Sequence, residues 1–229
     1  MNESETNRQT CVTPTSGCGG KGCKVLLING SPRKNGNTYI ALSEAARTLE
    51  SNGIATEIVQ IGVKPVRGCI ACGQCRQKQL GRCVFDDDVC NRISEKLDSV
   101  DAIIVGTPVY YGQPNGSVLS LIQRMFFSAG DKVQNKPAAA VCVCRRGGAT
   151  AAIQTMNMPF LMMNMPLVSS QYWNIVYGRE EGEASLDTEG MQTMRTLATN
   201  MACMLSKIHS GETPDYPARE PWTPMHFIR

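Results

Sequence analysis

Short apolar runs alternate with stretches of helical spacing along most of this chain, and this alternation restricts the fold to few classes. We predict strands over residues 24–29, 54–61, 102–106, 138–144 and 167–176. We predict helices over residues 38–52, 86–98, 116–127, 149–164 and 190–208. Strands that alternate with helices form parallel sheets, because a right-handed crossover returns each strand to the same direction. The sequence therefore predicts a doubly wound, three-layer α/β/α fold with five parallel strands in the order 2-1-3-4-5.

The predicted elements occupy one domain, residues 24–208, which two arms flank. Residues 1–23 are polar and rich in Gly and Thr, so we expect a flexible N-terminal tail. Residues 209–229 are rich in proline, which argues against a helix or a central strand and predicts an extended arm. Inside the domain, residues 68–85 follow no periodicity and carry four cysteines. We treat this stretch as a cysteine loop.

Composition excludes several classes of protein. A net charge of +3, with no basic cluster interleaved with aromatics, gives no indication of a nucleic-acid partner. No apolar run approaches the roughly 18–20 residues that span a bilayer, and the N-terminus has no secretory apolar region, so we expect a cytoplasmic protein with no membrane partner. The only histidines, His209 and His226, are too few for a histidine-based zinc site. Eleven cysteines in a reducing compartment indicate metal, cluster or redox chemistry, and argue against structural disulfides.

Residues 30–38, Gly-Ser-Pro-Arg-Lys-Asn-Gly-Asn-Thr, connect the first predicted strand to the first helix. The loop matches neither the dinucleotide fingerprint nor the Walker loop. Its backbone N–H groups, the hydroxyls of Ser31 and Thr38 and the helix dipole supply the several donors that a phosphate monoester needs. The alternative is an ordinary strand–helix turn capped by Asn37 or Thr38.

Two further segments leave neighbouring strands. Residues 107–112, Thr-Pro-Val-Tyr-Tyr-Gly, follow the third strand, and residues 144–148, Cys-Arg-Arg-Gly-Gly, follow the fourth. Together with residues 30–38, they resemble the flavin-binding loops of the NADPH-dependent FMN reductase group in the flavodoxin-like superfamily. The resemblance covers residues 24–207. It implies a flavodoxin-like fold, non-covalently bound FMN and a homodimer or homotetramer.

The resemblance implies a set of cofactor contacts in these loops. They are Ser31, Arg33, Asn35, Asn37, Thr38, Pro108, Val109, Tyr110, Tyr111, Gly112, Asn115, Arg146, Gly147 and Gly148. Aromatic and apolar side chains suit a flat ring, and glycines let the main chain approach it closely. For one of the two tyrosines, simple packing is the alternative. No catalytic residue is assigned, because the cofactor does the chemistry and the protein supplies binding and orientation.

The cysteine loop carries Cys69, Cys72, Cys75 and Cys83 in the spacing C-x-x-C-x-x-C-x7-C. The run resembles the compact motif of iron–sulfur flavoproteins, and the resemblance implies that these four thiolates hold a [4Fe–4S] cluster. The last spacing is long for that group, and no proline follows the fourth cysteine. Two alternatives stay open: free or redox-active thiols, and a structural zinc ion. Basic residues around the thiols would offset the negative charge of a cluster.

Other features receive simpler interpretations. Cys11, Cys18 and Cys23 match no motif, and the remaining cysteines are predicted to be small buried hydrophobes, with Cys144 beside the flavin loop. The methionines of residues 156–165 predict an adaptable apolar wall that faces a partner or a substrate. The three aspartates at 86–88 are interpreted as a helix start.

The resemblance leads to three hypotheses of function. The first is an FMN-dependent oxidoreductase that takes hydride from NAD(P)H and passes electrons to a small-molecule acceptor, such as a quinone or a flavin, or to an iron–sulfur acceptor. The second is an iron–sulfur flavoprotein electron carrier, reduced by a ferredoxin-like protein without NAD(P)H activity. The third is a thiol-based redox or metal sensor on a flavodoxin scaffold.

Overall fold

The computed structural model describes residues 22–210. The expected C-terminal arm beyond Ser210 and the expected N-terminal tail before Gly22 lie outside these residues, and so do Cys11, Cys18 and His226. Within the described range, no helix combines the length and the apolar character that crossing a membrane would require.

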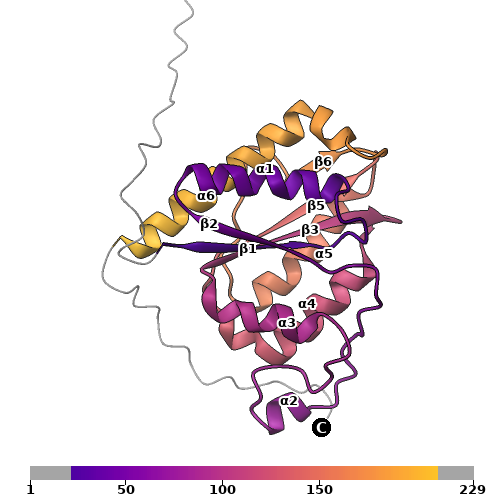
Figure 1. The fold of residues 1–229 in the computed structure, drawn as a ribbon, viewed down its shortest axis with the longest axis vertical. Coiled ribbons are helices and arrows are strands. Elements are labelled where there is room, and N and C mark those ends of the chain that lie inside the picture. Colours follow the sequence, from indigo (N-terminus) through magenta and orange to yellow (C-terminus); the bar gives the residue numbers. More distant parts are fainter. Residues whose placement is uncertain (1–21, 211–229) are drawn as a thin grey trace, which may run out of the picture.

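Strands and helices alternate along the described chain, as Figure 1 shows. The strands are β1 (Lys24–Asn29), β2 (Ala55–Gln60), β3 (Ala102–Tyr110), β4 (Gln113–Pro114), β5 (Ala138–Cys144) and β6 (Ile175–Tyr177). The α-helices are α1 (Asn37–Ser51), α2 (Gln74–Gln77), α3 (Cys90–Ser94), α4 (Gly116–Ala129), α5 (Ala149–Met162) and α6 (Thr188–His209). Short 3-10 helices are η1 (Glu95–Ser99), η2 (Gly130–Lys132) and η3 (Glu183–Leu186).

Five of the strands run parallel in the order β2-β1-β3-β5-β6. In the register of the central strands, Leu27 of β1 lies opposite Ile58 of β2 and Ile104 of β3. The short strand β4 stands off this path and pairs antiparallel with the end of β3. With β4 set aside, the order is the predicted 2-1-3-4-5, so the predicted fold class is confirmed.

Alternate residues of the central strands face opposite helix layers. Leu26 and Ile28 belong to the apolar cluster shared with α3, α4 and α5, whereas Val25 and Leu27 belong to the cluster shared with α1 and α6. Figure 1 shows α1 and α6 above the sheet and α3, α4 and α5 below it. Both faces of the strands are therefore buried, which explains why they are unbroken apolar runs in the sequence.

Two strands differ from the prediction by more than one residue at an end. β3 continues past the predicted end at Gly106 as far as Tyr110, because β4 folds back and pairs with this extension. The fifth parallel strand covers only Ile175–Tyr177 and not residues 167–176. Leu167 reaches β5 through one isolated bridge, and a polar loop separates that bridge from β6.

The helix predicted over residues 86–98 begins later and is divided. It starts at Cys90 as α3 and continues as η1, so the three aspartates precede the helix and do not open it. Asp88 instead accepts the N–H of Cys90 at 2.9 Å and turns its carboxylate into the protein interior. Inside the cysteine loop, the structure also contains the one-turn helix α2, which the sequence did not indicate.

Candidate functional site

A hollow opens at the carboxyl ends of β1, β3 and β5, where the three predicted loops meet. We call it the strand-end hollow. Its lining residues are Ser31, Arg33, Asn37, Thr38, Pro108, Val109, Tyr110, Val143, Cys144, Arg145, Gly178 and Arg179. Ligands of doubly wound sheets bind at this end, where the strand order reverses, which here is between β1 and β3.

Buried polar side chains hold the loop after β1 in shape. Asn29 is fully buried; its Oδ1 accepts the N–H of Ser31 at 3.1 Å, and its Nδ2 donates to Oε1 of Gln60 at 2.6 Å. Gln60 in turn donates to the carbonyl of Ser31. The Ser31 hydroxyl accepts the N–H of Arg33 at 3.1 Å. The protein itself therefore fixes the loop backbone around Ser31.

The N-terminus of α1 is open towards the strand-end hollow. Its N-cap residue is Gly36, and no side chain caps the helix. Thr38 lines the hollow and is 2% exposed, and its hydroxyl has no hydrogen-bond partner within residues 22–210. The first N–H groups of a helix and its dipole attract an anion. The alternative of a turn capped by Asn37 or Thr38 therefore does not form here.

Two glycines allow β1, β3 and α1 to approach one another beneath this loop. Gly30 donates to the carbonyl of Gly106 at 2.8 Å, and a Cβ on Gly30 would lie 2.6 Å from that oxygen. A Cβ on Gly106 would lie 2.9 Å from side-chain atoms of Thr38 and Leu42. Close approach, and not a special backbone conformation, is therefore what requires glycine at both positions.

Asn37 lies at the hollow, but its amide group is already engaged by the chain. Its Nδ2 donates to the carbonyl of Glu180 at 2.8 Å, and its Oδ1 accepts the N–H of Ala184 at 3.1 Å. Asn37 therefore joins the start of α1 to the loop that follows β6. Asn35, by contrast, is exposed and is not among the lining residues.

The β3–β4 hairpin forms a second wall of the hollow. Pro108, Val109 and Tyr110 line it, and Tyr110 is 47% exposed. Tyr111 is fully exposed with φ 51° at the tip of the turn, outside the lining. Asn115 is buried: it donates its N–H to the Thr107 hydroxyl at 2.9 Å and caps α4. Asn115 thus fixes the hairpin to α4.

The loop after β5 packs directly against this hairpin. Gly148 has φ 85°, and a Cβ there would lie 2.7 Å from the Cα of Gly112. Arg146, Gly147 and Gly148 lie beside the hollow but do not line it, whereas Cys144 and Arg145 do. Burial raises the pKa of Cys144, so this thiol is held in its neutral form.

Gly178 and Arg179, in the loop after β6, complete the lining, and the sequence did not indicate them. With Arg33 and Arg145, Arg179 gives the hollow three guanidinium groups. Arg179 pairs with Glu180 at 3.0 Å. The segment lies outside the three recognised loops and reaches the hollow only because β6 pairs with β5.

A second hollow lies in the cysteine loop, and all four predicted cysteines line it. We call it the cysteine hollow. Cys69 and Cys72 are exposed, Cys75 and Cys83 are buried, and all four are free. The other lining residues are Ile70, Gly73, Val84, Phe85, Arg124, Phe127 and Ser128. Four thiols that line one hollow with an otherwise mostly apolar wall are a suitable donor set for a [4Fe–4S] cluster.

The backbone between these cysteines is sharply turned. Ala71, Gly73, Gln79 and Gly81 all have positive φ, and two of them are not glycines. A positive φ at a non-glycine residue, here Ala71 and Gln79, costs of order 1–3 kcal/mol and persists where the surroundings hold the residue in place. Asn91, which is 1% exposed, holds the end of the loop by accepting the N–H of Cys83 at 2.9 Å and donating to its carbonyl at 3.0 Å.

A buried ion pair joins the two ends of the cysteine loop. Arg124 of α4 pairs with Asp88, and their side chains are 1% and 3% exposed. Arg124 also donates to the carbonyl of Arg67 at 3.0 Å, while Asp88 accepts the N–H of Arg67 at 2.9 Å. Burial opposes ionisation of Asp88, but hydrogen bonds from Arg124 and two backbone N–H groups outweigh it and hold its pKa below the usual range.

The sulfur positions bear on the zinc alternative. A tetrahedral zinc ion with Zn–S bonds of about 2.3 Å would draw its sulfurs to within about 4 Å of one another. Among the described residues, no three sulfurs of the cysteine loop lie within 4.8 Å of one another. The four thiols therefore do not form a preassembled site for one zinc ion in this arrangement.

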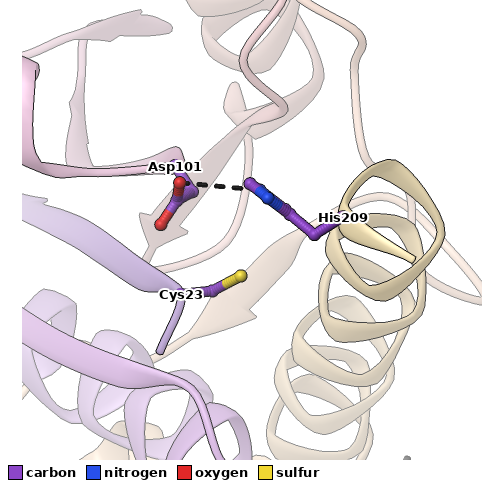
Figure 2. A group of neighbouring side chains, drawn as sticks. All are labelled: Cys23, Asp101 and His209. Atoms are coloured by element: carbon purple, nitrogen blue, oxygen red, sulfur yellow. Dashed lines mark ion pairs between the residues drawn. The ribbon is translucent and has the colours of Figure 1, made fainter. Parts of the chain in front are cut away.

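The ligand atoms of Cys23, Asp101 and His209 do lie within 4.8 Å of one another. Figure 2 shows the three side chains pointing toward one another. His209 Nε2 lies 3.5 Å from Oδ1 of Asp101, and Oδ2 of Asp101 accepts the N–H of Lys24 at 2.8 Å. Cys23, however, is disulfide-bonded, although the cysteine count argued against structural disulfides. We therefore interpret this group as an anchor of α6 to the start of the sheet, remote from both hollows.

Comparison with known proteins agrees with this geometry. The family model described as NADPH-dependent FMN reductase matches residues 23–180. An iron-sulfur flavoprotein of Methanocaldococcus jannaschii is 33% identical over 78% of this chain and 95% of its own length. An iron-sulfur flavoprotein of Methanosarcina thermophila is 32% identical over 82% of this chain and 98% of its own.

Solved structures show the same fold at lower identity. A flavodoxin, WrbA-like protein from Agrobacterium tumefaciens has a TM-score of 0.56 at 18% identity and covers 82% of this chain and 99% of its own. RosB, solved with 8-demethyl-8-formylriboflavin-5'-phosphate, has a TM-score of 0.64 at 15% identity and covers 90% of this chain and 94% of its own. The predicted flavodoxin-like architecture is thus confirmed.

Proposed function

The chain belongs to the NADPH-dependent FMN reductase family, with iron–sulfur flavoproteins among its relatives, and we propose that it is an FMN-dependent oxidoreductase that takes hydride from NAD(P)H. The family supports a redox role with FMN; the hydride donor and the electron acceptor are our proposal. The acceptor is a quinone, a flavin or an iron–sulfur centre. The observation that carries the proposal is the strand-end hollow, in which all three flavin-type loops take part.

In this proposal, the start of α1 holds the FMN phosphate. The uncapped N–H groups of α1 and the free hydroxyl of Thr38 are ready to donate hydrogen bonds, and the bonds of Asn29 and Gln60 to Ser31 fix the neighbouring loop in place. Arg33 adds a positive charge at the same wall. Asn37 keeps the loop after β6 closed against this region by its two hydrogen bonds to that loop.

The hairpin wall is assigned to the flavin ring. Val109 and Tyr110 present apolar and aromatic surface, and Gly112 and Gly148 let the two loops meet without side chains between them. Bound FMN exchanges a hydride or single electrons, and can therefore link two-electron donors to one-electron acceptors. The remaining site predictions, Asn35, Tyr111, Asn115, Arg146 and Gly147, stay predictions.

We assign the cysteine hollow to a [4Fe–4S] cluster held by Cys69, Cys72, Cys75 and Cys83. The support is the donor set itself: four free thiols that line one hollow. The iron-sulfur flavoproteins among the relatives agree with this assignment.

The cysteine hollow also favours a second candidate function. If its cluster exchanges electrons with a ferredoxin-like protein, the chain is an electron carrier that needs no NAD(P)H. Cys69 and Cys72 are exposed, so this hollow lies near the surface, where a protein donor could approach it.

We also propose that the chain self-associates as a homodimer or homotetramer. From Gly147 to Gly178 the sequence contains no charged residue and no histidine, although α5 and the loop before β6 reach the surface. The exposed apolar residues there are Met158, Leu161, Met162, Tyr172, Trp173 and Tyr177. Loss of charge with enrichment in Met and aromatics is typical of the core of an interface.

The first test is an absorption spectrum of freshly purified, anaerobic protein, with iron and sulfide analysis. We expect flavin bands together with a broad cluster absorbance. Cys72→Ser should lose iron while keeping FMN, because the loop ligands are remote from the strand-end hollow. Iron retained in this variant would remove the cluster assignment, and protein that stays colourless with excess FMN would remove the function.

The second test separates the two candidate functions. Oxidised protein is mixed anaerobically with NADH or NADPH, and flavin absorbance is followed by stopped flow. Rapid bleaching supports the oxidoreductase. Bleaching no faster than in the absence of nucleotide, together with rapid reduction by a ferredoxin, supports the carrier.

A further inference from the structure

Arg124 is a charged residue on the buried side of α4, where its helix neighbours Leu121, Ile122 and Met125 are apolar and fully buried. Its side chain is 1% exposed and lines the cysteine hollow. Removing a charge from water costs several kcal/mol unless good partners compensate it. An arginine at this position therefore calls for a local reason.

The partners of Arg124 account for only part of its guanidinium. One terminal nitrogen pairs with Asp88, and the other donates to the carbonyl of Arg67 at 3.0 Å. Its Nε–H is buried and has no hydrogen-bond acceptor within residues 22–210, although the buried thiol of Cys90 lies close enough to the guanidinium to interact with it electrostatically. A buried donor without an acceptor costs about 1–3 kcal/mol, so an unfilled acceptor position is expected beside it.

The Arg124–Asp88 ion pair has a defined orientation relative to the cysteine hollow. Arg124 lines the cysteine hollow, whereas Asp88 does not, so the pair presents its positive end to the four thiols. The other arginines in or next to the cysteine loop are exposed to solvent, and two are paired with acidic residues: Arg67 with Asp87 and Arg82 with Asp86. Solvent screens such exposed charges, but it screens the buried Arg124 far less.

We propose that Arg124 tunes the reduction potential of the iron–sulfur cluster in the cysteine hollow, with its buried charge facing the cluster and its Nε–H donating to a sulfur. The inference rests on the proposed cluster. Reduction adds one electron and therefore one negative charge, which a nearby positive charge and a sulfur hydrogen bond both stabilise. Arg124 is in this sense a positioning and tuning residue, and the iron ligands remain the four cysteines.

The test is the midpoint potential of the cluster, measured by redox titration followed by EPR. Asp88→Asn keeps Arg124 and removes its counter-charge, so the potential should rise. The double variant Asp88→Asn/Arg124→Gln removes both charges and the Nε–H, so the potential should fall below that of the unmodified protein. We expect at least a tenfold shift in the reduction equilibrium between these two variants, which is about 59 mV for one electron.

Arg82→Gln is the matched control, because it removes one exposed arginine from the same loop and should move the potential little. A purely structural role for Arg124 would change cluster content but would not reverse the sign of the shift. If the variants carry a full cluster and their potentials agree with that of the unmodified protein, the inference is overturned.

A measurement on the unmodified chain covers the case in which the variants fail to fold. Protein labelled with 15N-arginine is reduced, and pulsed EPR should detect nitrogen coupled to the cluster, also in Arg82→Gln. A reduced cluster without such coupling would overturn the proposed hydrogen bond. Protein without iron would overturn the proposed cluster as well, whereas an iron-loaded protein without coupling leaves the proposed function standing.

Discussion

The hydroxyl of Thr38 adds a hydrogen-bond donor to the N-terminus of α1, and we expect this donor to contact the FMN phosphate. Thr38 is buried at the start of α1, and its methyl group packs close to Gly106. Thr38→Val keeps this packing but removes the hydroxyl. A hydrogen bond to a charged group contributes about 1.5–3 kcal/mol, so FMN should bind roughly 10- to 100-fold more weakly.

Riboflavin, which has no phosphate, serves as the control ligand for Thr38→Val. Its affinity should change little, and fluorescence quenching titrations with both flavins make the comparison. Equal weakening of FMN and riboflavin binding would place the phosphate elsewhere.

The buried carboxylate of Asp88 should give the folded state a marked acid sensitivity. Its pKa is lowered in the folded protein, so its contribution to the free energy of unfolding is complete above the unfolded pKa of about 3.9 and is lost as pH falls through the lower folded value. Asp88→Asn leaves Arg124 unpaired and should cost about 3–5 kcal/mol at pH 7. Urea unfolding at several pH values should show this difference shrinking below about pH 4; a difference independent of pH would contradict the ion pair.

The β3–β4 hairpin and the loop after β5 meet through their turns, at Gly112 and Gly148. Gly148 combines a φ of 85° with a contact that leaves no space for a Cβ beside Gly112. Gly148→Ala should therefore destabilise the protein by about 1–3 kcal/mol and weaken FMN binding. Gly147→Ala is the control, because a Cβ there has nothing within 4 Å, and its cost should stay within about 0.5 kcal/mol. Thermal unfolding of both variants compares them, and equal stability would refute the close contact.

The same contrast explains which elements the sequence could predict. Strands β1 and β5 are buried on both faces, so their apolar runs define them fully, and both have their predicted bounds. The extension of β3 to Tyr110 depends on pairing with β4, and β6 is short because its neighbouring segment leaves the sheet. Such pairings depend on tertiary structure, so the local periodicity of the sequence cannot predict them.

The candidate sites divide in the same way. Cysteine spacing identified the four residues of the cysteine hollow, because the ligands lie close together in the sequence. Arg124 and Arg179 were missed, since each reaches its hollow through the packing of a distant helix or strand. One signal was available for Arg124: a lone charge among the apolar positions of a buried helix.

A single copy of the chain exposes apolar side chains from residues 147–178, a stretch without charged residues, and we expect a second copy to cover them. Leu161 of α5 is 57% exposed beside Met158 and Met162. Leu161→Glu places a charge in the proposed interface and should weaken self-association roughly thirtyfold or more. Sedimentation of the variant and of the unmodified protein over a range of concentrations measures the change.

Leu186→Glu is the control for this experiment, because Leu186 is 78% exposed and lies outside the uncharged stretch. It should leave self-association unchanged. An unmodified protein that stays monomeric at micromolar concentration would remove the proposed interface.

Helix α4 imposes a fixed spacing on the two hollows of one chain. Asn115 caps it against the β3–β4 hairpin, and Arg124 follows nine residues later at the cysteine hollow. At a rise of 1.5 Å per residue, about 14 Å of continuous helix separates these points. Adding or deleting one residue between them would rotate Arg124 by about 100° around the helix axis, away from the thiols. The number of residues in this stretch is therefore as strict a requirement as their identity.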